Sequence, residues 1–216
     1  DDPHCPISKL LSLENTVSGK IQDHETINNC ASVAKNLGLS VHMDGARLAN
    51  AAVKLDASMS SLVEKIDSVS LCLSKGLGSP VGSVLVGPKD FIKRAYRIRK
   101  LLGGGLRQSG ILAAAGIYAL ENNIERLEVD HKNALYLARK LKKIPGIYLK
   151  IKDVQTNMIF INIPAGSSNK FKSYCLKNKI LINADSDNIR LVTHLDIDRD
   201  KISYFIEKLN SFFNIT

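Results

Sequence analysis

Two ionisable residues in this chain each follow an apolar stretch that has the length of a buried strand. Asp44 comes directly after residues 39–43, and Lys75 comes two residues after a second apolar stretch at 68–73. A lysine at the end of an apolar strand is rarely a packing choice, because charged side chains are almost never buried unless they are paired. In open α/β sheets, ligands bind at the carboxyl ends of the strands. We therefore expect Asp44 and Lys75 to lie at one ligand-binding edge.

An amine and a carboxylate at such an edge are the two groups that a pyridoxal-phosphate enzyme requires. The lysine forms a Schiff base with the cofactor, and the carboxylate keeps the pyridine nitrogen protonated so that the ring can accept electrons. Gly76, Gly78 and Gly82 would allow tight turns and the close approach of a ligand. Position alone leaves an alternative open, in which Asp44 caps a helix and Lys75 is a surface lysine.

The elements that position these residues alternate between strand and helix. The apolar patterns predict strands at 10–14, 39–43, 68–73 and 82–86, and helices at 24–37, 46–55, 60–66, 89–102 and 108–120. This alternation is typical of an α/β fold with a mostly parallel sheet and crossover helices. Residues 1–122 are therefore predicted to form a partial large domain.

The pattern changes character around residue 122. A long charged helix is predicted to run to residue 143, followed by strands at 148–151, 158–163, 180–183 and 189–192 and helices at 170–179 and 199–213. Residues 123–216 are therefore predicted to form a small C-terminal α+β domain.

Composition and charge exclude several classes of function. No apolar run approaches the roughly 20 residues that span a bilayer, and no basic-then-apolar leader is present, so no membrane role is expected. The formal charge of +9 is spread over the chain. Its basic clusters at 93–100 and 140–143 lack the interleaved aromatic residues of a single-strand binding platform, so no nucleic-acid role is expected. The chain begins without Met and in mid-pattern, which favours a fragment or a processed form.

The four cysteines are widely separated and form no CxxC pair. Scattered cysteines indicate a reducing compartment and not a disulfide framework. Cys30 and Cys72 lie within apolar patterns, which predicts buried thiols. No set of Cys and His has the spacing of zinc ligands, so no metal site is expected.

Five segments in series add a resemblance to a known family. They are LENT at 13–16, HMDGAR at 42–47, SLCLSKGLGSPVGS at 70–83, GGGLRQ at 103–108 and RLVTHLD at 190–196. In this order and spacing they closely resemble the threonine aldolases, a fold-type-I group of pyridoxal-phosphate lyases. The resemblance implies cleavage of threonine or allo-threonine to glycine and acetaldehyde by a cytoplasmic homo-oligomer, a tetramer in the family.

The resemblance also implies roles for individual cofactor-binding residues. Lys75 would be the Schiff-base residue and Asp44 the partner of the pyridine nitrogen. Ser74 and Arg107 would hold the cofactor phosphate, and a planar guanidinium suits that bidentate role better than a lysine does. Arg47 would hold the cofactor oxygen or the substrate carboxylate.

At the substrate end, the resemblance assigns two further residues. His4 occupies the place of a family histidine near the substrate hydroxyl and would act as a base, because imidazole takes up a proton near neutral pH. Arg190 would bind the carboxylate of the amino-acid substrate from the second domain, in a cleft facing Lys75. A surface ion pair of Arg190 with Asp185 or Asp187 is the alternative.

Departures from the family pattern leave rival interpretations open. Val17-Ser18 stands where the family continues LENT with His-Asn, and the family's phosphate loop, its ring-stacking histidine and an N-terminal serine would precede residue 1. One rival is therefore an inactive truncated paralogue or fragment. The other is a different fold-type-I lyase or aminotransferase, which would share the Asp44–Lys75 pair.

Overall fold

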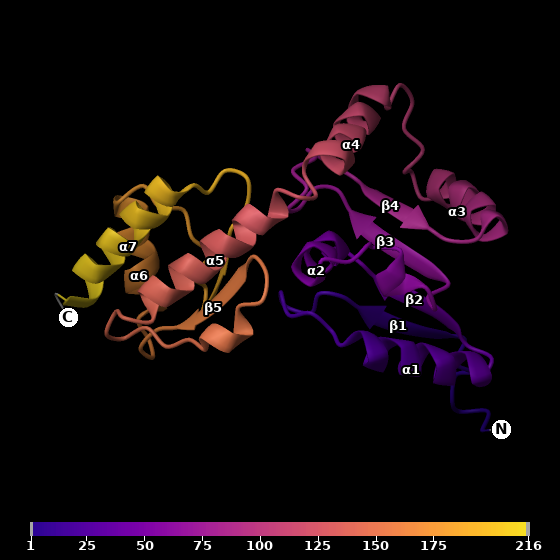
Figure 1. The fold of residues 1–216 in the computed structure, drawn as a ribbon, viewed down its shortest axis with the longest axis horizontal. Coiled ribbons are helices and arrows are strands. Elements are labelled where there is room, and N and C mark those ends of the chain that lie inside the picture. Colours follow the sequence, from indigo (N-terminus) through magenta and orange to yellow (C-terminus); the bar gives the residue numbers. More distant parts are fainter. Residues whose placement is uncertain (1, 215–216) are drawn as a thin grey trace. The chain divides into compact units, whose positions relative to one another are not determined.

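The computed structural model describes residues 2–214 and divides the chain into two compact units (Figure 1). Within that range, unit 1 comprises residues 2–17 and 21–125, and unit 2 comprises residues 18–20 and 126–214. The boundary expected near residue 122 lies at the end of the last helix of unit 1, just before this division.

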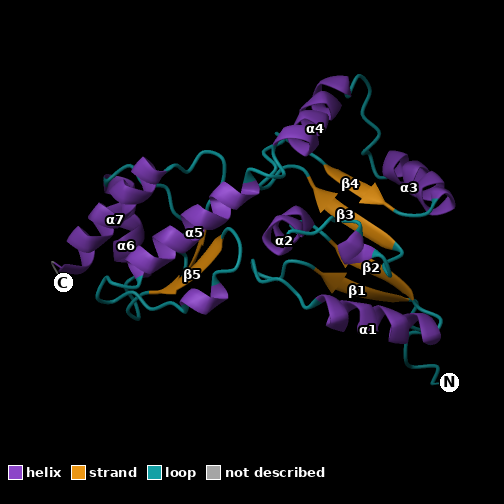
Figure 2. Cartoon of the chain, viewed as in Figure 1, coloured by secondary structure: helices purple, strands orange, loops and turns teal. Residues whose placement is uncertain are grey.

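Unit 1 is built on a four-stranded sheet (Figure 2). Its strands, in spatial as well as chain order, are β1 (Leu10–Glu14), β2 (Ser40–Asp44), β3 (Ser68–Cys72) and β4 (Ser83–Val86). The first three strands are parallel, and β4 pairs with β3 in the antiparallel direction. The prediction of an α/β fold with a mostly parallel sheet is confirmed.

The helices of unit 1 follow the predicted order. They are α1 (His24–Asn36), α2 (Leu48–Leu55), α3 (Lys89–Leu101) and α4 (Gly110–Asn122), with a short 3₁₀ turn at Ser61–Val63. The carboxylate of Asp23 caps α1 by accepting a 2.8 Å hydrogen bond from the Thr26 N–H, as expected of a helix N-cap. Gly38 ends the helix with φ 73°, a left-handed conformation that costs glycine little. The helix predicted at 60–66 is wrong in extent, because only the 3₁₀ turn forms there.

One face of the sheet carries the core of unit 1. Val41 and Met43 of β2 are fully buried against the apolar stripes of α1 and α2. Side chains alternate between the two faces of a strand, so the residues between them lie on the opposite face. That opposite face, which we call the open face, carries the exposed or half-buried residues Ser12, Glu14, Ser40, His42, Asp44 and Ser70, and also the buried Ser68. Parallel sheets normally have both faces covered.

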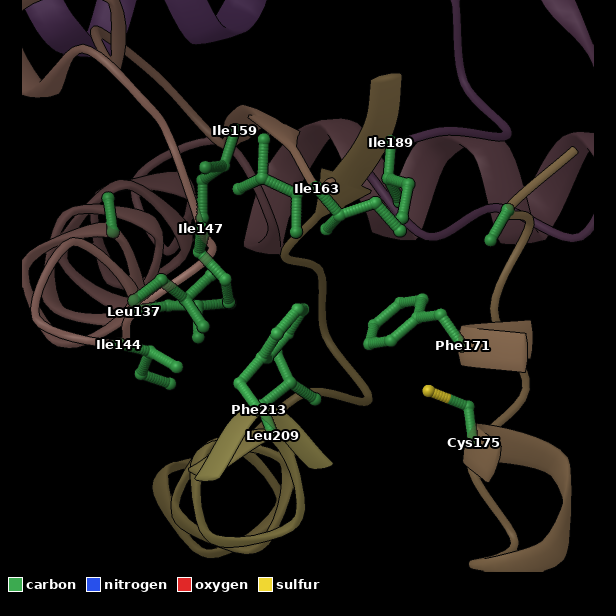
Figure 3. Packing of buried hydrophobic residues seen from close by; sticks show 14 of the residues in the cluster. Leu137, Ile144, Ile147, Ile159, Ile163, Phe171, Cys175, Ile189, Leu209 and Phe213 are labelled. Atoms are coloured by element: carbon green, nitrogen blue, oxygen red, sulfur yellow. The ribbon is translucent and has the colours of Figure 1, made fainter. Parts of the chain in front are cut away.

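Unit 2 packs helices against a two-stranded antiparallel sheet. Its elements are α5 (Leu127–Leu141), a 3₁₀ turn (Ile151–Asp153), β5 (Met158–Asn162), α6 (Ser168–Lys177), β6 (Asn188–Val192) and α7 (Arg199–Asn214). Figure 3 shows the core, in which Phe171 of α6 and Phe213 of α7 point toward the isoleucines of the sheet. The rings of Phe171 and Phe213 lie 6.1 Å apart between centroids.

Two strands predicted in unit 2 do not form. Residues 148–151 contribute only an isolated bridge between Tyr148 and Asn162, and residues 180–183 pair with no strand among residues 2–214. Ile180 and Ile182 nevertheless pack against the core. The segment therefore turns alternate side chains inward, as a strand would, but without backbone pairing.

The prediction of a buried Cys30 is also wrong. The buried stripe of α1 consists of Ile27, Ala31 and Ala34, and Cys30 lies just outside this narrow arc and is exposed. Cys72 is half-buried on the open face, and Cys175 is the buried thiol. All four cysteines are unbridged. Across residues 2–214, no helix is both long and apolar enough to cross a membrane.

Candidate functional site

The carboxyl ends of the three parallel strands meet at one edge of the sheet in unit 1. Glu14 at the end of β1 lies beside Asp44 at the end of β2, and Asp44 lies beside Ser70 of β3. The Asn15 N–H continues the ladder by donating to the Asp44 carbonyl over 3.1 Å. This register brings the end of every parallel strand to the place where Asp44 was expected to bind a ligand.

Asp44 occupies the turn that leads from β2 into α2. Its side chain is exposed on the open face, and its carboxylate accepts a 2.9 Å hydrogen bond from the Ala46 N–H. The next residue packs tightly, because a Cβ on Gly45 would lie 2.9 Å from Val69 Cγ1 and 3.0 Å from the Ser70 carbonyl oxygen. Only glycine fits there, and the turn therefore holds the Asp44 carboxylate at the sheet edge.

Lys75 lies three residues beyond the end of β3, on an ordered turn of the β3–β4 connection. Its carbonyl accepts a 2.9 Å bond from the Gly78 N–H. Leu77 is buried, and its carbonyl accepts a 2.7 Å bond from Asn123 Nδ2. The Lys75 side chain itself is exposed. The buried Leu77 thus fixes the backbone two residues after Lys75, whose side chain is exposed to solvent.

Two further predicted residues accompany this edge through the local sequence. Arg47 is half-buried and occupies the N-cap position of α2, three residues after Asp44, without a capping bond from its side chain. Ser74 is exposed beside Lys75. His42, interpreted from the sequence as structural, lies on the same face as Asp44 and its Nδ1 is 2.9 Å from the Ser68 hydroxyl.

The structure does not bring two predicted residues to this edge. Arg107 lies exposed in the connection between α3 and α4, and within residues 2–214 it forms no hydrogen bond or ion pair. His4 precedes the amino end of β1, the end opposite to Asp44, and its Nδ1 lies 3.0 Å from a carboxylate oxygen of Asp2. The roles of Arg107 and His4 stay predictions from the resemblance.

Arg190 belongs to unit 2 and projects from β6 opposite Phe160 of β5. Its side chain is exposed and lines a concave region of about 640 Å³ bounded by residues of β6, the 179–183 segment and α7. The alternative ion pairs are absent in the described range, because Asp185 pairs with Lys172 and Asp187 accepts bonds from the Gly166 and Ser168 N–H groups. Those bonds, first that from Gly166, hold the pKa of Asp187 below its usual range.

No individual role is predicted from the sequence for the residues at the end of β1. Glu14 places a second exposed carboxylate beside Asp44. Asn15 and Thr16 are buried, and Thr16 Oγ1 has no hydrogen-bond partner in the described structure. The only available signal was the LENT motif itself.

Among residues 2–214, no group of three or more His, Cys, Asp and Glu side chains could hold a metal ion.

The arrangement can therefore present a lysine amine, a carboxylate and a guanidinium on neighbouring turns at one edge of a parallel sheet. An amine on an ordered turn can bind a carbonyl carbon covalently. A fixed carboxylate can accept a hydrogen bond from a protonated ring nitrogen. These are the contacts that an aldehyde-bearing pyridine needs.

Comparisons with known proteins give a consistent result. The family model for beta-eliminating lyase matches residues 1–164. The low-specificity L-threonine aldolase of Escherichia coli K12 is 45% identical over 203 residues, which are 94% of this chain and 60% of that protein. Low-specificity L-threonine aldolase 1 of Arabidopsis thaliana is 42% identical, over 92% of this chain and 58% of that protein. The chain thus spans about three fifths of these relatives.

A solved structure shares the fold. The threonine aldolase of Leishmania major superposes with a TM-score of 0.79 at 21% identity, over 99% of this chain and 64% of that one. At that identity the likeness bears on the fold alone.

Proposed function

The chain belongs to the beta-eliminating lyase family, and from that premise we propose that the protein is a pyridoxal-phosphate-dependent aldolase. Its reaction is the cleavage of threonine or allo-threonine to glycine and acetaldehyde. The observation that carries this proposal is the 45% identity to L-threonine aldolase over 94% of the chain. Asp44 at the end of β2 and Lys75 three residues after β3, which pairs in parallel with β2, support it.

The donor set at that edge fits the cofactor. When bound, pyridoxal phosphate supplies an electron-withdrawing ring that takes up the electron pair of the breaking Cα–Cβ bond. Lys75 supplies the amine that holds the cofactor covalently, and its exposure and ordered backbone leave the amine free to do so. Asp44 holds the proton on the ring nitrogen, because its carboxylate is fixed by the turn into α2. Ser74 and Arg107 are proposed to bind the phosphate group.

Two arginines are proposed to hold the anionic end of the substrate. Arg47 stands one turn from Asp44. Arg190 has no ion-pair partner within residues 2–214, so its guanidinium is available to a carboxylate. A bidentate contact fixes the orientation of the substrate as well as its position. His4 remains the proposed base at the substrate hydroxyl.

We further propose that the protein is a homo-oligomer, a tetramer as in the resemblance. Support comes from α3, α4 and the connection between them, where large apolar side chains are more than half exposed: Tyr96, Ile98, Leu101, Leu102, Leu106, Ile111, Ile117 and Tyr118. Helix α4 has no charged residue before Glu121, yet only Gly116 and Ala119 are buried. A helix that is apolar on all sides is normally buried. Sedimentation of the protein as a monomer would contradict the oligomer.

The location and the metabolic role follow from the same proposal. Four unbridged cysteines support a reducing, cytoplasmic location. There the reaction would degrade threonine and supply glycine.

A non-catalytic role is the second candidate, and the open face favours it. Asp44 lies exposed on the open face, opposite the buried clusters around Met43 and Val41. A form in which that face stays uncovered would act as a binding or assembly partner. Such a form would bind the cofactor weakly, because water would compete at every contact.

One experiment separates these possibilities. The protein is incubated with pyridoxal phosphate and dialysed, its visible absorbance is recorded, and acetaldehyde release from L-threonine and L-allo-threonine is measured. An absorbance band that persists, is lost on borohydride reduction and is absent in Lys75→Ala supports the enzyme. Lys54→Ala, which removes another exposed lysine of unit 1, is the matched control. No retained band in the wild type supports the non-catalytic role, and a retained band without aldehyde release supports another lyase or aminotransferase.

A further inference from the structure

Helix α5 carries polar residues at positions that are fully buried. Asp130 and Asn133 are 0% and 4% exposed, although such side chains are mostly exposed in folded proteins. The Asp130 carboxylate pairs with Arg126 one turn earlier, and its backbone carbonyl is a separate acceptor. Buried polar groups are retained where each finds a hydrogen bond.

The partners of these residues lie in the segment that follows β6. The Thr193 hydroxyl donates to the Asp130 carbonyl over 2.7 Å, and Asn133 Nδ2 donates to the Ile197 carbonyl over 3.0 Å. Thr193 also exchanges bonds with Asn157, which directly precedes β5: the Thr193 N–H donates to the Asn157 carbonyl over 3.0 Å, and the Thr193 carbonyl accepts from Asn157 Nδ2 over 3.1 Å. Residues 193–197 are therefore hydrogen-bonded both to α5 and to the residue that precedes β5.

The alternation of β6 links this anchor to Arg190. Ile189 is fully buried and Arg190 is exposed, so residues 189, 191 and 193 point inward while residues 190 and 192 point outward. Thr193, whose side chain points inward, thus lies three residues after Arg190, whose guanidinium points outward. Both residues line the same concave region of about 640 Å³.

We infer that Thr193 is a positioning residue for Arg190, through the anchor that it forms with Asp130 and Asn157. The anchor fixes the twist and the register at the end of β6, and with them the direction in which the guanidinium leaves the strand. This inference rests on the proposed function, in which Arg190 binds the substrate carboxylate. Without the anchor, the strand end would keep its apolar packing but lose its fixed direction.

Thr193→Val tests the inference, because valine keeps the shape and removes only the hydroxyl. We expect the KM for threonine to rise about tenfold, since a misplacement of about 1 Å costs up to roughly a hundredfold, while kcat and the cofactor absorbance stay near wild type. Thr193→Ser keeps the hydroxyl and should restore the KM. The matched control is Thr156→Val, because Thr156 is equally buried and its hydroxyl donates to the Gly19 carbonyl over 2.6 Å. It should leave the KM unchanged.

An unchanged KM in Thr193→Val, or an equal rise in Thr156→Val, would overturn the inference. Hydrogen exchange of the peptide covering residues 188–194 supplies a readout that does not depend on activity. Thr193→Val should accelerate exchange of the Leu191 and Thr193 amides more than Thr156→Val does, and equal acceleration overturns the anchor. If the wild type cleaves no threonine, the proposed function fails, and the exchange measurement alone decides about the anchor.

Discussion

Removing the carboxylate of Asp67 should destabilise unit 1 by about 2–3 kcal/mol, because a fully buried backbone donor depends on it. One carboxylate oxygen accepts a 2.7 Å bond from the N–H of Val41, which is 0% exposed, and the other lies 3.0 Å from Lys35 Nζ. A hydrogen bond to a charged group contributes about 1.5–3 kcal/mol, and an orphaned buried donor costs a similar amount. The Lys35 pair adds well under about 1 kcal/mol, because its side chains are 43% and 39% exposed.

Urea unfolding of Asp67→Ala and Lys35→Ala measures the two contributions separately, as shifts of the transition midpoint at constant slope. Burial alone would raise the pKa of Asp67, but the bonds from Val41 and Lys35 outweigh it and hold the pKa below its usual value. A carboxyl with a lowered folded-state pKa stabilises the protein above its unfolded pKa. That contribution is lost as the pH falls through the folded value. The difference between wild type and Asp67→Ala should therefore shrink in acid. Equal losses in the two variants at neutral pH would refute the reasoning.

Three further predictions concern the site and the core of unit 2. Arg190→Lys should raise the KM for threonine with the cofactor absorbance intact, because a point charge replaces a planar fork; loss of the absorbance would place Arg190 at the cofactor instead. Phe171→Ala should lower the free energy of unfolding by about 3–5 kcal/mol, since the ring is fully buried among the core residues of Figure 3. Thermal or urea unfolding measures this, and a loss below about 1 kcal/mol would contradict that packing. Burial raises the pKa of the Cys175 thiol to about 11. A maleimide near neutral pH should therefore label the exposed Cys5 and Cys30 but react with Cys175 only after unfolding. Mass spectrometry of the labelled peptides measures this.

The sequence predicted the elements around Asp44 because their signals are local. An apolar strand, a helix cap and a glycine stop each depend on a few adjacent residues, and the bounds of β1 and α1 agree closely with the pattern. The expectation that β1 would be buried is wrong, because its residues are exposed or half-buried. The same logic brought Asp44 and Lys75 to strand ends. It failed at residues 180–183, because alternation reports which side chains turn inward and not whether a neighbouring backbone edge is available.

Residues far from that edge in the chain were harder to place. The expected site roles of Arg107 and His4 depend on how a connection and a chain end fold back, and no local pattern encodes such a path. The anchor around Thr193 joins three separate elements. From the sequence, Asp130 and Asn133 read as ordinary polar positions on a charged helix, so their burial had no visible signal.

The open face has a consequence for how substitutions in this protein would be tolerated. Ser12, Ser40 and Ser70 point away from the buried clusters around Met43 and Val41, so larger side chains there would leave the folded yield of this chain nearly unchanged. A library selected for folding would therefore classify the face as permissive. Under the proposed function, a library selected for threonine cleavage would reject the same substitutions, because a bulky residue beside Asp44 would occupy the space proposed for the cofactor. The difference between the two selections, position by position along β1, β2 and β3, would show which part of the open face the proposed reaction uses.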